Sequence, residues 1–245
     1  MSPERLAGRR ILITRPEEDA VRWVERLRKL GAEPIVMPCL EIVPLADADT
    51  ARTLRRALDR ASWLVLSSRR GVEAVHELIG DAIPPRVQVA VVGPTSARAA
   101  AELLGRVDIV STESTARALA RTLVERLRER GGAEHVVVAG AANGRTDDEV
   151  ALAEADVAVT RIALYATVPA APAAVKRDLG ADGVQHVLLA SPSAAEGLAN
   201  RALVPADVQV ITIGPTTTAA AAAAGLTVSA EARHPDLDGM LEAIP

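Results

Sequence analysis

The same succession of short motifs occurs twice along this chain of 245 residues. In the first copy, a serine loop at residues 66–72 precedes a Gly-Pro-Thr loop at residues 91–97. In the second copy, the corresponding loops lie at residues 189–195 and 212–218. From the aligned serine to the aligned glycine there are 25 positions in the first copy and 23 in the second. Because order and spacing agree together, we interpret the chain as one module used twice, which predicts two similar lobes.

Short β-branched runs alternate with longer helical patterns, which is typical of βαβ units and parallel sheets. A helix is expected over residues 17–30, because apolar residues recur there at helical spacing and Gly31 follows as a C-terminal cap. A second repeat, of the form strand, helix, strand, spans residues 11–38 and 135–165. The expected strands are residues 11–14, 34–38, 63–66, 88–92, 107–110, 135–138, 157–159, 186–189, 208–213 and 226–228.

Two extended segments interrupt this alternation, because each follows a strand directly and precedes a proline. We expect them to be linkers between the lobes, at residues 40–46 and 159–168. One lobe is then continuous over residues 47–158, and the other joins residues 1–39 to residues 169–245. The predicted fold class is α/β, with two similar lobes of parallel sheets flanked by helices and joined by two extended linkers.

Composition excludes several classes of function. The net charge of −4 and the near absence of aromatic residues argue against nucleic-acid binding. No apolar run approaches the roughly 18 residues of a membrane span, and the N-terminal residues lack a signal-peptide pattern. Cys39 is the only cysteine and the four histidines are widely spaced, so no metal site is expected. Dinucleotide, P-loop and nucleophile-elbow motifs are absent, so no cofactor is expected. We therefore expect a cytoplasmic protein. The sequence does not indicate an oligomeric state, and a monomer is the default expectation because no exposed heptad pattern or long apolar edge is evident.

Ligands of parallel sheets bind beyond the carboxyl ends of the strands, where helix N-termini supply N–H groups that suit anions. Five loops expected there are rich in serine, threonine and glycine. Each residue could serve only as a helix cap or turn former, but together the loops favour a cleft for a polyanion. Arg69 and Arg145 are further positive groups near these loops. The candidate binding residues are Thr14, Arg15, Ser67, Ser68, Arg70, Gly93, Thr95, Ser191, Ser193, Gly214, Thr216 and Thr217.

Tyr165 is the only tyrosine of the chain and lies near the end of the second expected linker. A single tyrosine is more often an amphipathic packing residue than a catalytic one. Its expected position beside the cleft nevertheless makes it the best candidate for a hydroxyl acid.

In their order and spacing these motifs resemble those of the uroporphyrinogen-III synthase family. The matching segments are residues 11–16, 63–72, 90–95, 164–167, 191–194 and 213–217. Two departures are visible: residues 140–143 lack a basic residue usual in that family, and residues 67–72 read Ser-Ser-Arg-Arg-Gly-Val where Thr-Ser-Ala-Asn-Gly-Val is frequent.

The resemblance implies a two-lobed enzyme of tetrapyrrole biosynthesis that acts on hydroxymethylbilane. This open tetrapyrrole carries eight carboxylates; it loses its terminal hydroxyl and closes with ring D inverted. The resemblance implies that Tyr165 donates the proton to the departing hydroxyl, directly or through water, and that the polar loops hold the substrate carboxylates. It implies no metal and no organic cofactor. The alternative is a non-catalytic two-lobed cytoplasmic sensor for an anionic small molecule, which turnover of hydroxymethylbilane would distinguish.

Overall fold

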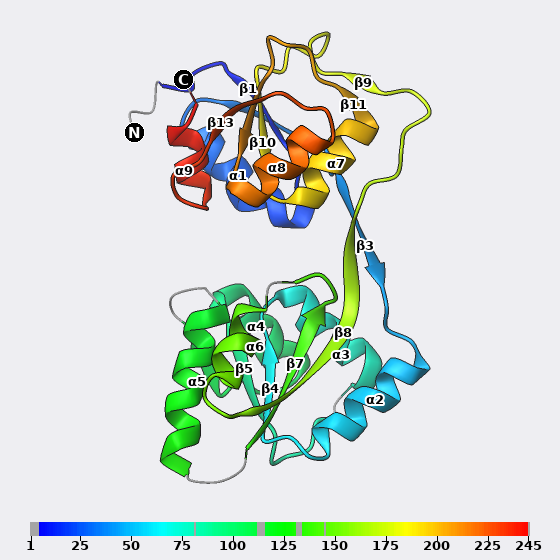
Figure 1. Ribbon diagram of the computed structural model, residues 1–245, viewed down its shortest axis with the longest axis vertical. Coiled ribbons are helices and arrows are strands. Elements are labelled where there is room, and N and C mark those ends of the chain that lie inside the picture. The colour runs from blue at the N-terminus through cyan, green and yellow to red at the C-terminus, as the bar shows by residue number, and fades with distance from the viewer. Residues whose placement is uncertain (1–4, 81, 112–115, 131–133, 145, 245) are drawn as a thin grey trace. The chain divides into compact units, whose positions relative to one another are not determined.

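A computed structural model describes residues 5–80, 82–111, 116–130, 134–144 and 146–244 (Figure 1). The chain divides into two compact units. Unit 1 comprises Met1–Ile42 and Thr167–Pro245, and unit 2 comprises Val43–Ala166. No helix of the described residues is long and apolar enough to cross a membrane.

Unit 1 contains a five-stranded parallel sheet and a separate two-stranded ribbon. The elements of unit 1 are β1 (Arg10–Ile13), α1 (Glu17–Lys29), β2 (Glu33–Val36), β9 (Arg177–Asp178), β10 (His186–Leu189), α7 (Pro192–Arg201), β11 (Ala202–Leu203), β12 (Gln209–Thr212), α8 (Pro215–Ala223), β13 (Val228–Glu231) and α9 (Leu237–Glu242).

Unit 2 is built around a six-stranded sheet. Its elements are α2 (Ala48–Leu58), β4 (Trp63–Leu66), α3 (Arg69–Ile79), β5 (Gln88–Val92), α4 (Gly93–Leu103), β6 (Ile109–Ser111), α5 (Ala116–Arg130), β7 (His135–Ala141) and α6 (Asp147–Ala153). Two further strands, β3 (Leu40–Pro44) and β8 (Ala158–Pro169), cross the boundary between the units and lie side by side (Figure 1).

The two sheets have the same topology. The strand order is β13-β12-β10-β1-β2 in unit 1 and β3-β8-β7-β4-β5-β6 in unit 2. If β3 is left out, the unit 2 sheet reads β6-β5-β4-β7-β8 from its opposite edge. Position by position, β6 then corresponds to β13, β5 to β12, β4 to β10, β7 to β1 and β8 to β2. Both sequence repeats therefore fall on equivalent strands. The predicted fold class is confirmed.

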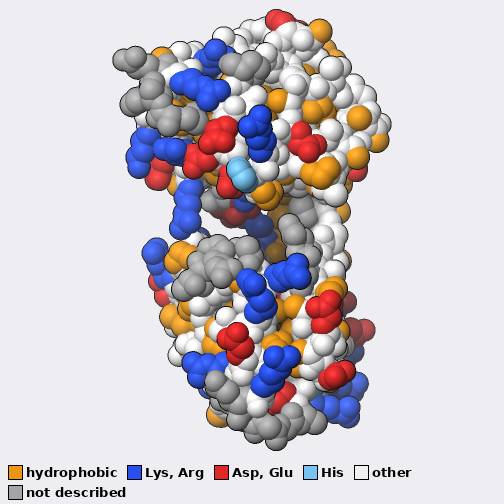
Figure 2. Space-filling model, turned by 60° about the vertical axis from the view of Figure 1, so that its left-hand side comes forward, with side chains coloured by type: hydrophobic (Ala, Val, Ile, Leu, Met, Phe, Trp, Pro, Cys, Tyr) orange, Lys and Arg blue, Asp and Glu red, His pale blue; other side chains and the backbone are white. Residues whose placement is uncertain are grey.

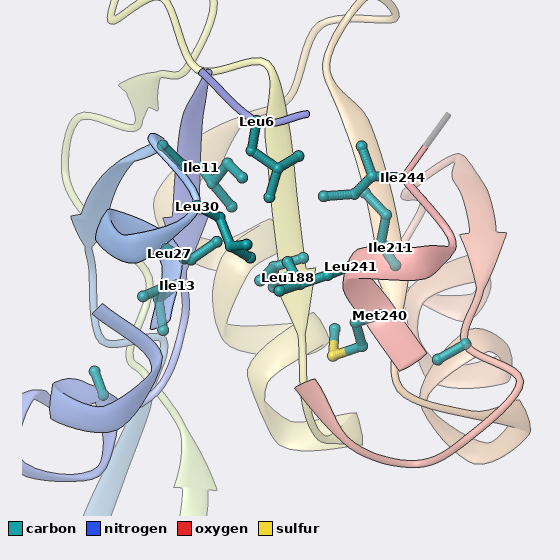
Figure 3. Packing of buried hydrophobic residues seen from close by; sticks show 13 residues of the cluster. Leu6, Ile11, Ile13, Leu27, Leu30, Leu188, Ile211, Met240, Leu241 and Ile244 are labelled. Atoms are coloured by element: carbon teal, nitrogen blue, oxygen red, sulfur yellow. The ribbon is translucent and has the colours of Figure 1, made fainter. Parts of the chain in front are cut away.

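Alternating side chains of the unit 1 sheet enter separate cores on its two faces, as expected for strands covered on both sides. In unit 1, Ile11 and Ile13 pack with residues of α1 and α9 (Figure 3), whereas Leu12 belongs to a core with α7 and α8. In unit 2, Trp63 and Val65 pack against α5 and α6. Each fully buried aliphatic side chain contributes roughly 1.5–3 kcal/mol, so these layers hold the loop ends in fixed positions.

The expected helix at residues 17–30 is present as α1. Acidic residues occupy its first turn and basic residues its last turn, which complements the helix dipole. Gly31 follows with a φ of 81°, a left-handed conformation that favours glycine over other residues.

The structure differs from the sequence analysis at β8. Residues 159–165, which the sequence pattern predicts to be part of a linker, pair with β7 as a strand of the sheet. Pairing satisfies main-chain N–H and C=O groups that an isolated extended segment would leave to water. β6 and β13 also begin two residues later than expected. At β6, the Asp108 carboxylate accepts a hydrogen bond from Val89 N at 2.8 Å, and regular pairing starts after it.

Candidate functional site

Tyr165 and Ser68 meet at the carboxyl ends of the unit 2 strands. Tyr165 belongs to β8, and Ser68 follows β4. The Tyr165 Oη and Ser68 Oγ atoms are 3.0 Å apart, within hydrogen-bond distance. β7 lies between their strands and ends in the small residues Ala139-Gly140-Ala141, which leave space for this contact.

A β-bulge precedes the tyrosine. Gly140 of β7 pairs with Ala163 of β8, but the next residue, Ala141, pairs with Tyr165. Leu164 is therefore an extra residue on β8, and such bulges redirect the side chains that follow them. The Tyr165 carbonyl accepts a hydrogen bond from Ala142 N at 2.7 Å, which fixes the backbone after the bulge. Tyr165 is 7 % exposed, so a small part of its side chain remains accessible.

Ser68 is also the N-cap of α3. Its Oγ accepts a hydrogen bond from Gly71 N at 3.0 Å. A side chain at position 71 would bring its Cβ to 3.3 Å from this Oγ, which is tighter than most such contacts, and to 3.4 Å from Ala139 O, at the limit of ordinary contact. Gly71 therefore gives the serine room between α3 and β7.

The two arginines after Ser68 have different surroundings. Arg69 forms an ion pair with Glu73 on the next turn of α3, with 2.7 Å between Nε and Oε1. The Arg70 guanidinium carbon lies 6.0 Å from the centroid of the Tyr165 ring, where the cation is attracted by the aromatic face. Of the two, Arg70 is the positive group beside the tyrosine. Arg145 lies outside the described residues.

The other predicted residues of unit 2 lie at neighbouring strand ends. Ser67 is exposed after β4, and the Gly93-Pro94-Thr95 loop begins α4 after the adjacent strand β5. Gly93 is buried and has a φ of 75°. Thr95 is exposed in the first turn of α4. The structure thus places six predicted residues at the carboxyl ends of the strands of the unit 2 sheet: Ser67, Ser68, Arg70, Gly93, Thr95 and Tyr165.

In unit 1, two of the predicted binding residues are buried. Thr14 is 0 % exposed, and its Oγ1 donates a hydrogen bond to Leu188 O at 2.9 Å, which ties β1 to β10. Thr217 is 1 % exposed within α8. This burial argues against direct ligand contacts from these two side chains and favours a packing role for both.

The remaining predicted residues of unit 1 stay at the carboxyl ends of their strands. Ser191 is the N-cap of α7 and accepts a hydrogen bond from Ala194 N at 3.2 Å, while Ser193 is half-buried in the first turn. Gly214 and Thr216 lie at the start of α8, where Thr216 is exposed. The Arg15 guanidinium carbon lies 5.0 Å from the centroid of the Trp23 ring.

Sequence reasoning missed Arg161, which fixes the loop beside Tyr165. Arg161 Nη2 donates a hydrogen bond to Ala141 O at 2.7 Å, and Nη1 forms an ion pair with Glu149. The side chains of Arg161 and Glu149 are 24 % and 22 % exposed, so water screens this pair less than an open surface pair. The signal available in the sequence is an arginine four residues before the only tyrosine, in a segment predicted to be a linker.

Charges of both signs are distributed over the units. Lys and Arg side chains lie among Asp and Glu side chains on the face that Figure 2 shows. Among the described residues there is no group of three or more His, Cys, Asp or Glu side chains arranged to hold a metal ion.

The family model of uroporphyrinogen-III synthase HemD matches residues 21–242 of this chain. The chain belongs to the uroporphyrinogen-III synthase family. The porphyrin biosynthesis protein HemD of Ruminiclostridium josui is 28 % identical over 199 residues, which are 78 % of this chain and 39 % of that protein. The uroporphyrinogen-III synthase of Synechococcus elongatus is 30 % identical over 166 residues, which are 61 % of this chain and 62 % of that protein. The chain thus spans less than two thirds of the length of these curated relatives.

Solved structures of the same family share the fold. The uroporphyrinogen-III synthetase of Helicobacter pylori has a TM-score of 0.59 at 13 % identity, covering 96 % of this chain and 97 % of that one. A mutant uroporphyrinogen III synthase of Thermus thermophilus has a TM-score of 0.55 at 18 % identity, covering 96 % of both chains. At these identities the structures establish that the chain has the fold of uroporphyrinogen-III synthases.

Proposed function

We propose that this chain is a uroporphyrinogen-III synthase. It would convert hydroxymethylbilane into uroporphyrinogen III with inversion of ring D, a step of tetrapyrrole and heme biosynthesis. Membership of the family supports this proposal. The single structural observation that supports it best is the hydroxyl pair of Tyr165 and Ser68 beside Arg70, at the carboxyl ends of the unit 2 strands.

The reaction begins with loss of the terminal hydroxyl of hydroxymethylbilane. In the proposal, the Tyr165 phenol gives a proton to this hydroxyl, directly or through one water, and the hydroxyl leaves as water. The resulting azafulvene is attacked by the substituted carbon of ring D, and the spiro intermediate fragments and recloses with ring D inverted. This chemistry asks the protein for one proton donor and for accurate positioning, so the proposal includes no metal and no cofactor.

Recognition of the eight carboxylates is assigned to the polar loops. Helix N-termini supply unpaired N–H groups and a positive dipole end, which suit carboxylates. In unit 2, Ser67, Arg70 and Thr95 are the side chains proposed for this task. In unit 1, the proposed side chains are Arg15, Ser193 and Thr216.

The decisive experiment measures which isomer forms. Hydroxymethylbilane closes without an enzyme to the symmetric type I isomer, so its disappearance proves nothing. Purified protein mixed with hydroxymethylbilane is expected to give mainly type III, read by chromatography after oxidation. If only type I forms at every enzyme concentration, the synthase proposal is wrong, and the non-catalytic sensor for an anionic small molecule takes its place.

The monomeric state and the cytoplasmic location that the sequence leads us to expect belong to the same proposal. Light scattering coupled to gel filtration would test the first, expected at the mass of one 25.6 kDa chain. Fractionation of the source cells would test the second.

A further inference from the structure

The Ser68 hydroxyl has two hydrogen-bonding partners, Gly71 N and Tyr165 Oη, and it can form only a few hydrogen bonds. A serine hydroxyl has one hydrogen and two lone pairs. One lone pair of Ser68 Oγ accepts the Gly71 N–H at 3.0 Å. Its hydrogen and its second lone pair remain, and Tyr165 Oη lies 3.0 Å away, where either hydroxyl could donate to the other.

We propose that Ser68 is a positioning residue that donates its hydroxyl hydrogen to Tyr165 Oη. With this bond in place, the phenol hydrogen of Tyr165 is not used by Ser68 and is available to the substrate. The bond strengthens when the phenol loses its proton, because an ionised oxygen is a better acceptor than a neutral one. Ser68 then stabilises the phenolate that proton transfer creates. This inference rests on the proposed function of Tyr165 as the acid.

The surroundings of Ser68 reinforce this direction of donation. The serine caps the positive end of α3, a helix of 11 residues, and the Gly71 N–H polarises its hydroxyl. Arg70 adds a full positive charge near the tyrosine ring. A chain of donors therefore runs from the helix N–H through Ser68 to Tyr165, and each link favours negative charge on the phenol oxygen.

The bonds and protons of this reaction balance. The O–H bond of Tyr165 and the C–O bond of the substrate break, and water leaves. The negative charge left on Tyr165 faces the Ser68 donor. The final ring closure releases a proton from the unsubstituted carbon of ring D, and this proton restores the phenol. No oxidant, reductant or second substrate takes part.

Three substitutions at Ser68 separate capping from donation. Ser68→Thr keeps both the cap and the donor, so kcat for type III is expected within about threefold of the unsubstituted protein. Ser68→Asp keeps the cap, but its carboxylate only accepts hydrogen bonds and takes up the phenol hydrogen. For Ser68→Asp we expect kcat to fall about 10²-fold, and KM to rise as well, because the added carboxylate repels the substrate carboxylates. Ser68→Ala loses the cap and the donor together, and its kcat is expected to fall at least as far as that of Ser68→Asp.

Asp47→Ala is the matched control for helix capping. Asp47 caps α2 in the same unit and accepts a hydrogen bond from Thr50 N at 2.7 Å. Removing this cap should lower the melting temperature while leaving kcat and the isomer ratio unchanged. Circular dichroism of every variant checks that the protein is folded.

Tyr165→Phe distinguishes failure of this inference from failure of the proposed function. If Ser68 acts through Tyr165, adding Ser68→Asp to Tyr165→Phe should lower kcat little further. A slow Tyr165→Phe variant beside a fully active Ser68→Asp variant would overturn the role of Ser68 and leave the synthase proposal standing. A fully active Tyr165→Phe variant would remove the tyrosine from catalysis and overturn this inference. Exclusive formation of type I by the unsubstituted protein would overturn both.

Discussion

Unit 1 and unit 2 have the same strand order, yet the equivalent loops of the two units hold different side chains. Ser68 and Ser191 follow equivalent strands, and each caps the helix that comes next. Ser68 also contacts Tyr165, the only tyrosine of the chain, whereas Ser191 has no tyrosine to contact. The comparison teaches that the repeated fold provides helix caps and open N–H groups in both units. The residue proposed as the proton donor lies in only one of them, unit 2.

The largest effect is expected when the proposed acid of unit 2 is removed, and it is compared with the removal of a positive charge from unit 1. Tyr165→Phe keeps the ring but removes the phenol, so kcat for type III should fall roughly 10²-fold with little change in KM. Arg15→Ala removes one positive group proposed to hold a carboxylate. Its KM should rise, more at low salt than at high salt, with kcat nearly unchanged. Steady-state rates at two ionic strengths check both expectations.

The same pattern from both variants would remove the distinction between the units. If Arg15→Ala lowered kcat as Tyr165→Phe does, unit 1 would take part in the chemical step. Melting temperatures of both variants serve as the control for folding.

The next largest effect is expected at a close helix contact of unit 1. A Cβ added to Gly197 of α7 would lie 1.6 Å from Cys39 O and 2.9 Å from Ala170 N, so backbone would have to move. The equivalent position on α3 in unit 2 is Ala74, which already has a Cβ. Gly197→Ala should lower the free energy of unfolding by about 3 kcal/mol or more, at the upper end for overpacking. Chemical denaturation measures it, and an unchanged midpoint would show that α7 is not held this closely.

A smaller difference is expected between the two Gly-Pro-Thr loops. Gly93 has a φ of 75°, which is strained for any residue with a Cβ, whereas Gly214 has a φ of 167°, which is ordinary extended backbone. Gly93→Ala should cost about 1–2 kcal/mol of stability. Gly214→Ala should change it by less than about 0.5 kcal/mol, since nothing lies within 4 Å of the added Cβ. Equal effects from the pair would mean that the loops have the same backbone after all.

These positions show what the sequence can and cannot predict. The alternation of strands with helices and the similarity of the two units follow from the sequence repeats, because these patterns are set by local propensity and burial; the strand order does not. The contact between Tyr165 and Ser68 joins residues that are 97 positions apart, and it depends on a β-bulge at Leu164 and on the small end of β7. Neither leaves a periodic signal. Likewise, the burial of Thr14 and Thr217 depends on tertiary packing, which a threonine in a loop motif does not reveal.

The smallest expected effect concerns pH and again separates the units. The first residue of β10 in unit 1 is His186, and the first residue of the equivalent strand β4 in unit 2 is Trp63, which does not titrate. Burial lowers the pKa of His186 below its ordinary value of 6.5, and the nearby Arg9 charge lowers it further. His186 Nε2 lies 2.9 Å from Arg9 Nη1, a contact in which the neutral ring accepts and the protonated ring cannot.

Because the pKa of His186 is lower in the folded protein than in the unfolded chain, the unfolded chain binds this proton first as the pH falls. The histidine therefore favours folding above pH 6.5, and this contribution is lost as the pH falls below that value. The free energy of unfolding, measured by denaturant between about pH 7.5 and about pH 5, should decline less steeply in His186→Gln than in the unsubstituted protein. Parallel curves for His186→Gln and the unsubstituted protein would show that His186 takes up its proton equally well in both states. The first strand positions of β10 and β4 would then not give the two units a different dependence of stability on pH.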